Sequence, residues 1–299
     1  MHQILILICR PDKPVLDDST LRTLRARLDD LGAESAPPAW LDPTIACEIG
    51  FDGIDGEQAV AAARLVLGER PVDVAAMTTE HRRKALLVAD MESTIIENEM
   101  LDELAEFLGL RAHIAAITAR AMNGEIDFAA ALKERVLLLK DMEQAKLDHA
   151  ATLIRIMPGA QTLIATMRAN GAYCALVSGG FTVFTDAIHK QLGFDSHHAN
   201  SLLLENGKLT GTVGEPILGK EAKLEMLLKL AGERHLKLAQ TIAVGDGAND
   251  LPMLQAAGLG VAYRAKPSVA AACRVRIDHG DLTALLYLQG YRRDEFVGQ

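Results

Sequence analysis

The first 80 residues alternate between short apolar runs and longer segments with a helical period. The run Ile4–Ile8 is apolar throughout, which is typical of a buried strand, whereas leucines at 21, 24, 28 and 31 recur every three or four residues, as on one face of a helix. The predicted elements are a strand at 2–9, a helix at 16–31, extended runs at 34–40 and 44–51, a helix at 56–67 and a strand at 72–77. This β-α-β-β-α-β order predicts a small ferredoxin-like sandwich over residues 1–80.

From residue 81 onward the pattern becomes a βα alternation with one helical insertion. Residues 81–84, His-Arg-Arg-Lys, are predicted to be a solvated linker into the strand 85–89. The segment from about 99 to 155 is helical throughout and too long for a simple crossover, which predicts a helical cap. Further strands are predicted at 173–177, 241–244, 258–262 and 275–277, with a hairpin around Asn206-Gly207. Residues 81–299 are therefore expected to form a doubly wound α/β domain with a mostly parallel sheet and the inserted cap.

Length and charge restrict the classes of function. A chain of 299 residues is expected to hold about two domains, and its 49% hydrophobic residues suffice for a sizeable core. The formal net charge of −9 argues against nucleic acid or an anionic membrane surface as a partner.

Four isolated cysteines without a CxxC pair indicate free thiols in a reducing cytoplasm. The run Ile4–Ile8 is far shorter than the ~20 residues that span a bilayer. We therefore predict a cytoplasmic protein.

Acidic clusters follow two of the predicted strands. Asp90 comes directly after the strand 85–89, and Asp246 follows the strand 241–244 closely. The C-terminal ends of parallel strands open into one crevice, so these carboxylates are expected to meet there. Carboxylates without neighbouring Cys or His favour a hard cation such as Mg²⁺ over zinc. The alternative is that both acids only cap the N-termini of helices.

This arrangement predicts magnesium-dependent phosphoryl transfer. Asp90 is the candidate nucleophile, because a carboxylate that attacks phosphorus forms an acyl-phosphate and divides hydrolysis into two easier steps. Asp246 is the expected second protein ligand of the metal. Asp250, one helical turn later, is expected to orient Asp246.

Two weaker signals complete a phosphate site. Ser178-Gly179-Gly180 follows the strand 173–177 and precedes a helix, so this loop offers a hydroxyl and unobstructed N–H groups. Lys223 lies near the start of a predicted helix at 220–232 and would place a positive charge on the phosphoryl group. Taken singly, the first is more often an ordinary turn and the second a solvated lysine.

Several stretches around the predicted site and in the predicted cap match a known family. They are Asp90–Thr94, Glu99–Leu104, Ala121–Gly124, Phe128–Val136, Val177–Phe181, Ala222–Lys223 and Val244–Asp250. Together they resemble the haloacid dehalogenase-like phosphatases, and within them the phosphoserine phosphatases. The strand-end motifs are short and unspecific, whereas the linked stretches in the cap make the resemblance specific.

The resemblance implies a role for each matched position. Asp90 would be the nucleophile and Glu92 the general acid/base, and Mg²⁺ would be held by Asp90, the backbone carbonyl of Glu92 and Asp246. The positions that match substrate-binding residues are Ser178, Gly179, Lys223 and Asn249 for the phosphoryl group, Glu99 for an amino group, Arg135 for a carboxylate, and Met122 and Phe128 for the lining of the cap pocket.

Glu92 departs from the family pattern, which has aspartate two positions after the nucleophile. The extra methylene moves the carboxylate by more than ~1 Å unless the side chain folds back, and a misplacement of that size can cost ~10²-fold in rate. Glutamate has a similar intrinsic pKa, so proton transfer remains available to it. We expect an active enzyme with an adjusted acid/base geometry.

These inferences predict hydrolysis of O-phosphoserine to serine and phosphate, the last step of serine biosynthesis. One alternative is another small phosphate ester, or an acceptor alcohol in place of water. The other is a catalytically impaired regulatory protein that senses amino acids, which only Glu92 favours. Residues 1–80 resemble the ACT type of regulatory or dimerisation domain, which makes a homodimer through this unit a further expectation.

Overall fold

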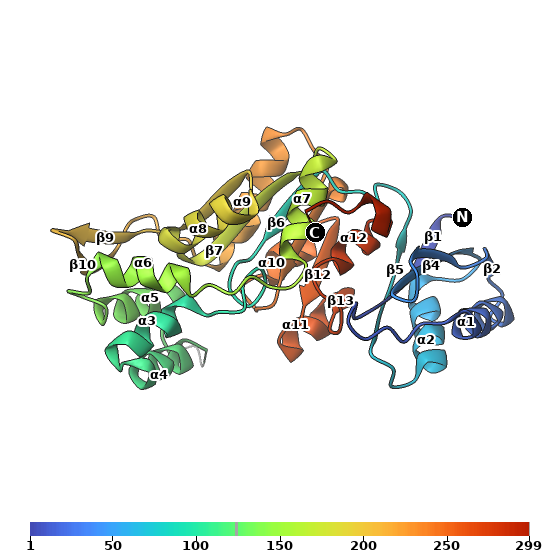
Figure 1. Ribbon diagram of the computed structural model, residues 1–299, viewed down its shortest axis with the longest axis horizontal. Helices are drawn as coiled ribbons and strands as arrows, with labels where there is room; N and C mark the ends of the chain where they lie inside the picture. Colours follow the sequence, from blue (N-terminus) through green and yellow to red (C-terminus); the bar gives the residue numbers. More distant parts are fainter. Residues whose placement is uncertain (123–124, 299) are drawn as a thin grey trace.

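Two α/β units, each built around its own sheet, make up the protein (Figure 1). The computed structural model describes residues 1–122 and 125–298. The N-terminal unit contains β1 (Gln3–Cys9), α1 (Asp18–Asp30), β2 (Glu34–Ser35), β3 (Ala39–Asp42), β4 (Ala46–Asp52), α2 (Gly56–Leu67) and β5 (Val72–Thr78). Its antiparallel sheet has the order β2-β4-β1-β5, and β3 also pairs with β4. The predicted first extended run is two short strands, because Pro37 and Pro38 between them supply no N–H for pairing.

Both faces of the N-terminal sheet are buried, which explains why β1 is apolar from Ile4 to Cys9. Leu5 and Leu7 lie in the core beneath α1 and α2. Ile4, Ile6 and Ile8 point to the opposite face and belong to the core that continues into the second unit, where β1 packs against α12 (Ala284–Leu288). Alternate side chains of a strand face opposite ways, so one apolar run serves two cores.

The second unit is a doubly wound parallel sheet, as the sequence predicted. Its strand order is β13-β12-β11-β6-β7-β8, and every pairing is parallel. The strands are β6 (Leu86–Ala89), β7 (Tyr173–Phe181), β8 (Ser196–Asn200), β11 (Thr241–Gly245), β12 (Leu259–Tyr263) and β13 (Val275–Ile277). The remaining helices of this unit are α7 (Ala160–Ala169), α8 (Thr182–Leu192), α9 (Lys220–Glu233), α10 (Leu251–Ala256) and α11 (Pro267–Ala272), with short 3₁₀ turns at Leu238–Gln240 and Arg293–Glu295.

The helical insertion forms a cap after β6, as predicted. It consists of α3 (Met100–Leu108), α4 (Arg111–Met122), α5 (Phe128–Leu137) and α6 (Gln144–Thr152). A hairpin of β9 (Leu202–Glu205) and β10 (Lys208–Val213) packs against α5 at the far end of the molecule (Figure 1). Asn206 and Gly207 turn this hairpin with φ of 51° and 75°, the positive values that an Asn-Gly turn favours.

Two chain crossings side by side connect the cap to the sheet. The N–H of Glu97 donates to the carbonyl of Arg155 at 2.9 Å, and the N–H of Met157 donates to the carbonyl of Ile95 at 2.9 Å. The outgoing and returning segments are therefore tied into a narrow antiparallel ribbon. Within the residues that the structure describes, no helix is both long enough and apolar enough to cross a membrane.

The prediction of a solvated linker at 81–84 holds for His81 and Arg83, which are exposed, but was wrong for Arg82, which is half-buried, and Lys84, which is buried. Arg82 pairs with Glu48 at 2.7 Å and donates from Nε to the carbonyl of Leu288 at 2.9 Å. Lys84 is 8% exposed and donates from Nζ to the carbonyl of Ala239. Arg82 joins the two units through Glu48, whereas Lys84 bonds within the second unit. Both have partners more than 30 residues away, which local sequence cannot reveal.

Asp73 on β5 makes the second polar connection between the units. Its carboxylate is 2% exposed and accepts the backbone N–H groups of Asp278, His279 and Gly280, at 2.8, 3.2 and 2.7 Å. Three N–H groups on one buried carboxylate compensate for its lost hydration. This loop follows β13, so the contact fixes the N-terminal unit to the edge of the parallel sheet.

We predict that Asp73→Ala destabilises the protein by about 2–4 kcal/mol, because it leaves buried N–H groups without acceptors. The free energy of unfolding from urea titration measures this change. Asp12→Ala is the matched control, since Asp12 is exposed and its ion-pair partner among the described residues is nearby Arg10. Equal stability of Asp73→Ala and wild type would contradict the assigned contact.

Candidate active site

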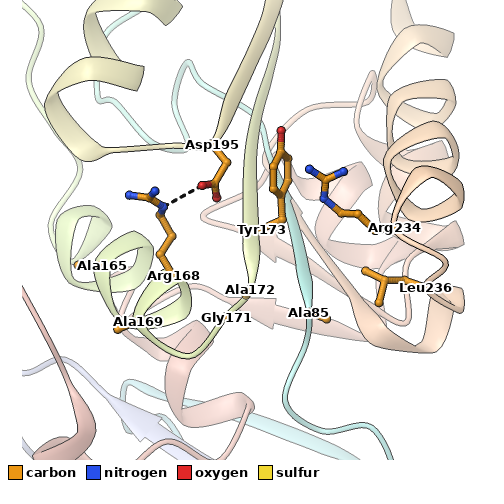
Figure 2. A pocket seen from close by; sticks show the side chains of 10 residues that line it. All are labelled: Ala85, Ala165, Arg168, Ala169, Gly171, Ala172, Tyr173, Asp195, Arg234 and Leu236. Atoms are coloured by element: carbon orange, nitrogen blue, oxygen red, sulfur yellow. Dashed lines mark hydrogen bonds and ion pairs between the residues drawn. The ribbon is translucent and has the colours of Figure 1, made fainter.

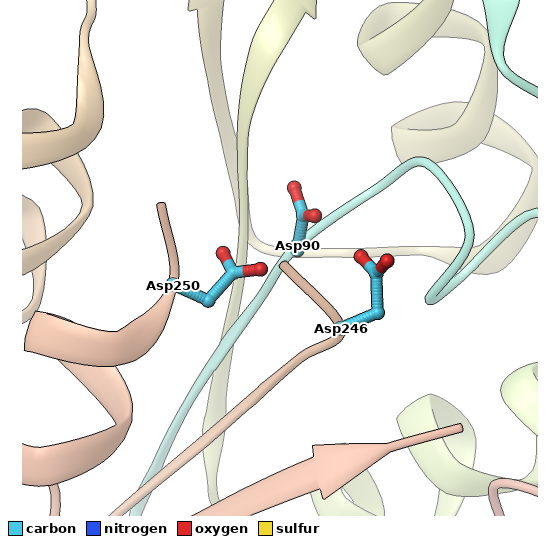
Figure 3. A group of neighbouring side chains, drawn as sticks. All are labelled: Asp90, Asp246 and Asp250. Atoms are coloured by element: carbon cyan, nitrogen blue, oxygen red, sulfur yellow. The ribbon is translucent and has the colours of Figure 1, made fainter. Parts of the chain in front are cut away.

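The predicted phosphate-handling residues gather at the C-terminal edge of the parallel sheet. β6 lies between β11 and β7, so Asp90 after β6, Asp246 after β11 and Ser178 within β7 come from three adjacent strands. One carboxylate oxygen from each of Asp90, Asp246 and Asp250 lies within 4.8 Å of the other two, and all three residues are buried. Figure 3 shows the three carboxyl groups turned toward a common space.

Lys223 on α9 lies at the centre of this acidic group. Its Nζ is 2.5 Å from Oδ1 of Asp90 and 2.5 Å from Oδ1 of Asp250, and the residue is 2% exposed. The alternative interpretation of Lys223 as a solvated helix residue is therefore wrong. A single buried ammonium group neutralises part of the charge on two carboxylates.

The contacts of Asp250 differ from those that its four-residue spacing from Asp246 predicted. Residues 246–250 form a turn, and α10 begins only at Leu251, so Asp250 is not one helical turn from Asp246. Its Oδ1 accepts from Lys223, and its Oδ2 accepts the N–H of Gly247 at 2.9 Å. Asp250 thus fixes the ammonium group and the turn that carries Asp246, and makes no hydrogen bond of its own to the Asp246 side chain.

The electrostatics of the acidic group favour a bound cation. Burial, followed by repulsion from Asp250, raises the pKa of Asp90 to about 7 and that of Asp246 to about 6. Such shifts mean that Lys223 alone does not compensate for the crowded negative charges. Oxygen ligands with excess negative charge and without Cys or His suit a hard divalent cation.

The Ser178-Gly179-Gly180 segment belongs to β7, which continues to Phe181 before α8 begins. Pairing with β8 shifts register between Val177 and Phe181, so the segment is an irregular strand end rather than a separate loop. Ser178 is 2% exposed, and its Oγ accepts the N–H of Gly180 at 2.9 Å. This segment places a hydroxyl at the C-terminal end of the strand that neighbours β6, which Asp90 follows.

Asn200, at the end of β8, supports this segment and was missed by the sequence reasoning. Its Nδ2 donates to the carbonyl of Gly179 at 2.9 Å, and its Oδ1 accepts the N–H of Leu218 at 2.7 Å. Leu218 lies two residues before α9, the helix that carries Lys223. One buried amide therefore ties the glycine segment to the start of α9, and nothing in the local sequence signals that role.

We predict that Asn200→Ala lowers kcat/KM for the substrate about 10-fold or more, because the Gly179 carbonyl and the Leu218 N–H lose their partner. Asn200→Asp is the control that keeps the acceptor for Leu218 but loses the donor to Gly179. Steady-state kinetics of the two variants separate these contacts. Wild-type kinetics in Asn200→Ala would exclude a positioning role.

Glu92 lies between the sheet and the cap. Its Oε1 accepts the N–H of Met100, the first residue of α3, at 2.8 Å. A Cβ placed on Gly180 would lie 3.2 Å from Oε2, so this second oxygen faces the Ser178 segment. Burial, followed by repulsion from Glu99 and Asp90, raises the pKa of Glu92 to about 8. A pKa raised in this way favours the protonated carboxyl group that a general acid requires.

The expected substrate-binding residues of the cap surround Glu92. Glu99 accepts a hydrogen bond from Ser93 Oγ at 2.7 Å. Arg135 on α5 is half-buried, and burial lowers its pKa, opposed by Glu92, Asp102 and Glu99. Its Nε donates to the carbonyl of Ala131, and none of the ion pairs found in the described ranges involves it.

The other expected pocket residues have more varied positions. The ring of Phe128 faces Gly179, since a Cβ placed there would lie 3.3 Å from its Cζ. Asn249 is half-buried in the turn after β11, and its Oδ1 lies beside Gly247. Met122 ends α4, and its side chain lies outside the described part of the chain.

Lys266 is a second cation near the acidic group that the sequence reasoning missed. Its Nζ lies 4.0 Å from Oδ2 of Asp246, and its N–H donates to the Asp246 carbonyl at 3.1 Å. The side chain is largely exposed, so the charge is screened by solvent. A lone lysine before a proline carries no local sign of this proximity.

A cavity of about 810 Å³ lies elsewhere and takes no part in this site. Figure 2 shows it between Ala85 and Tyr173, at the opposite, N-terminal ends of β6 and β7. Arg168 pairs there with Asp195 at 3.0 Å, and the guanidinium group of Arg234 stacks on the ring of Tyr173. These partners leave the cavity without a cluster of reactive groups among its lining residues.

Comparison with known proteins identifies relatives of the chain. The haloacid dehalogenase-like hydrolase family matches residues 87–255. A phosphoserine phosphatase of Streptomyces coelicolor is 40% identical over 85% of this chain and 62% of its own length, so the chain spans less than two thirds of that relative. A phosphoserine phosphatase of Lactococcus lactis is 45% identical over 68% of this chain and 94% of its own length.

Solved structures agree with these sequence relatives. A hydrolase of the same family from Salmonella enterica aligns with a TM-score of 0.84 and 28% identity over 96% of this chain and 97% of its own. A probable phosphoserine phosphatase from Vibrio cholerae aligns with a TM-score of 0.78 and 31% identity, covering 98% and 88% of the two chains. An analogue of the phospho-aspartyl intermediate of a phosphoserine phosphatase aligns with a TM-score of 0.64 and 38% identity, covering 69% and 98%.

The shared sheet, the inserted cap and the aspartates at the ends of β6 and β11 all lie within the aligned regions. The two bacterial phosphoserine phosphatases are 40% and 45% identical to this chain over 85% and 68% of its length. The chain belongs to the haloacid dehalogenase-like hydrolase family, in the group that contains the phosphoserine phosphatases.

Proposed function

We propose that this protein is a Mg²⁺-dependent phosphomonoesterase that hydrolyses O-phosphoserine to serine and phosphate. The observation that carries the proposal is the buried group formed by Asp90, Asp246 and Lys223 beneath a cap that presents Glu99 and Arg135. The first three suit a phosphoryl group, and the last two suit the charges of an amino acid. The names of the bacterial relatives support the same substrate.

In the proposed reaction Asp90 attacks the phosphorus atom in line with the departing serine oxygen. The bond between phosphorus and that oxygen breaks, and Glu92 gives its proton to the oxygen, which leaves a phosphorylated Asp90. Glu92 then takes a proton from water, and the water oxygen attacks phosphorus. Phosphate is released, and both carboxyl groups return to their starting states. The raised pKa of Glu92 supports its role as the initial proton donor.

The proposed metal ligands are Asp90, Asp246 and the backbone carbonyl of Glu92. Both oxygens of Asp250 accept hydrogen bonds, from Lys223 and from the N–H of Gly247, so we propose that Asp250 supports the site rather than holding the metal. A bound Mg²⁺ would neutralise charge on the nucleophile and on the phosphoryl group. Ser178, the Gly179 N–H, Lys223 and Asn249 are the proposed partners of the phosphoryl oxygens.

Recognition of the amino-acid part is proposed for Glu99 and Arg135, with Met122 and Phe128 lining the pocket. A zwitterion needs one anion for its ammonium group and one planar cation for its carboxylate. Arg135 is half-buried on α5, and its Nε bond to Ala131 leaves the terminal nitrogens of the fork for a ligand. The negative charges near it favour a cation at this position.

Arg135→Ala tests the substrate assignment. We predict a loss of about 10- to 100-fold in kcat/KM for O-phospho-L-serine, the value of charge-assisted hydrogen bonds. Phosphate release from phosphoethanolamine, which lacks the carboxylate, should change little. Arg135→Lys keeps the positive charge but loses the planar guanidinium group. Its kcat/KM for O-phospho-L-serine should therefore lie between those of wild type and Arg135→Ala. Equal losses with both esters would indicate a different substrate class.

The division of the chain into two domains with separate functions is also a proposal. We assign residues 1–80 to an ACT-like unit and residues 81–299 to the catalytic domain, with the cap at about 99–155. The separate sheets and the separate core under α1 and α2 support this division. A homodimer through residues 1–80 stays a prediction, and light scattering on the full chain would measure it directly.

A further inference from the structure

The side chain of Glu92 makes one of the polar connections between the parallel sheet and the cap. Glu92 follows β6 in the sheet. Its Oε1 accepts a hydrogen bond from the N–H of Met100, at the start of cap helix α3. The other oxygen, Oε2, faces Gly180 in the Ser178 segment. Oε1 is therefore held by the cap, whereas Oε2 faces the Ser178 segment, which is proposed to bind the phosphoryl group.

Side-chain length decides whether this contact forms. The hydrogen bond between Glu92 Oε1 and the Met100 nitrogen is 2.8 Å long. Aspartate at this position would be shorter by one carbon–carbon bond, about 1.5 Å, which places its oxygen beyond hydrogen-bond distance from the unmoved N–H. The extra methylene is thus taken up by a contact with the cap.

We propose that the backbone N–H of Met100 is a positioning group that holds the acid/base carboxyl of Glu92, so that this carboxyl is in place only when α3 is seated over the site. The inference rests on the proposed phosphatase function and adds to it a dependence of proton transfer on the cap. The cap then does more than cover the substrate, because its helix N-terminus orients the group that protonates the leaving oxygen.

Met100→Pro removes this N–H with little disturbance of the helix. Met100 is the first residue of α3, where proline is well tolerated, and Glu99 before it is extended with φ −103° and ψ 102°. Met100→Ala is the matched control, because it also shortens the buried side chain but keeps the N–H. We expect kcat for O-phospho-L-serine to fall about 10- to 100-fold in Met100→Pro relative to Met100→Ala, with KM changed less than about 3-fold.

The decisive comparison is a double-mutant cycle with Glu92→Asp. The N–H should matter only where a glutamate can reach it, so Met100→Pro should cost less than about 3-fold in the Glu92→Asp background. The same loss in both backgrounds, or wild-type kcat in Met100→Pro, would overturn the inference. An inactive wild type would instead refute the proposed function and leave the contact to be tested by exchange.

Hydrogen exchange at the Met100 amide provides a measurement that does not require the proline variant to fold. Glu92→Gln keeps both the reach and the acceptor oxygen, whereas Glu92→Asp loses the reach. We expect exchange protection of this amide to persist in Glu92→Gln and to fall at least about 10-fold in Glu92→Asp. Equal protection in the two variants would show that Glu92 does not hold this amide.

Discussion

Asp90→Asn is expected to abolish turnover of O-phosphoserine, with a loss of at least about 10⁴-fold in kcat. Asparagine keeps the shape of the side chain, but its neutral amide is a poor nucleophile toward phosphorus. The substitution also removes one of the two charges that Lys223 neutralises, so the fold should persist. Phosphate release under saturating Mg²⁺ measures the effect.

The control for this prediction is Asp12→Asn, since Asp12 is exposed and remote from the sheet edge that carries the site. Equal unfolding temperatures of Asp90→Asn and wild type would show that the loss is chemical. Residual activity within about 10²-fold of wild type would rule out Asp90 as the nucleophile, because noncovalent contributions alone do not restore a missing nucleophile.

Lys223→Met is expected to reduce both activity and stability. Its removal leaves Asp90 and Asp250 facing each other in a buried site, and breaking a buried ion pair in this way costs about 3–5 kcal/mol. Loss of a charge that stabilises the transferring phosphoryl group should lower kcat by about 10²–10³-fold. Urea unfolding in the presence of a chelator, together with steady-state kinetics, measures the two effects.

The loss of stability in Lys223→Met should depend on pH. Asp90 gains a proton on folding, because its pKa rises from 3.8 to about 7, so its charging costs stability as the pH increases through that interval. Lys223 offsets this cost. The loss of stability in Lys223→Met should therefore be largest above pH 7 and smallest near pH 5. Lys266→Met, at the exposed cation 4.0 Å from Asp246, is the control and should change stability little. A pH-independent loss would contradict the assigned charge pairing.

Strands could be predicted because their signals are local. The apolar runs that became β1, β6 and β11 are buried, and their polar residues Gln3 and Thr241 are the first residues of their strands. The parallel arrangement then placed Asp90 and Asp246 together, since neighbouring strands end at one edge. The hairpin at Asn206-Gly207 followed from the φ preference of these two residues.

Contacts between distant segments could not be predicted from the sequence. Arg82 looked like part of a basic linker, yet its charge is paired with Glu48 in the N-terminal sheet. Asn200 looked like an ordinary polar residue, yet it joins the ends of β7 and α9. Such roles depend on partners that only the folded chain brings near, and a side-chain amide or guanidinium group looks the same in sequence whether it is solvated or buried.

Glu92 shows both the reach and the limit of sequence reasoning. Its departure from the family pattern was visible, and so was the displacement that one methylene imposes. The partner that takes up this displacement, the Met100 N–H, was not visible, because it depends on where the N-terminus of α3 lies relative to the strand end. The catalytic roles assigned around it stay predictions until kinetics test them.

Trapping of the covalent intermediate tests the central claim most directly. Wild-type protein is mixed with Mg²⁺ and O-phospho-L-serine labelled in its phosphoryl group, quenched in acid within one turnover and digested, and the labelled peptide is sequenced. The account predicts an acid-stable, base-labile label on Asp90 that appears before free phosphate and is absent from Asp90→Asn. Phosphate release without any labelled peptide, or a label on another residue, would contradict it.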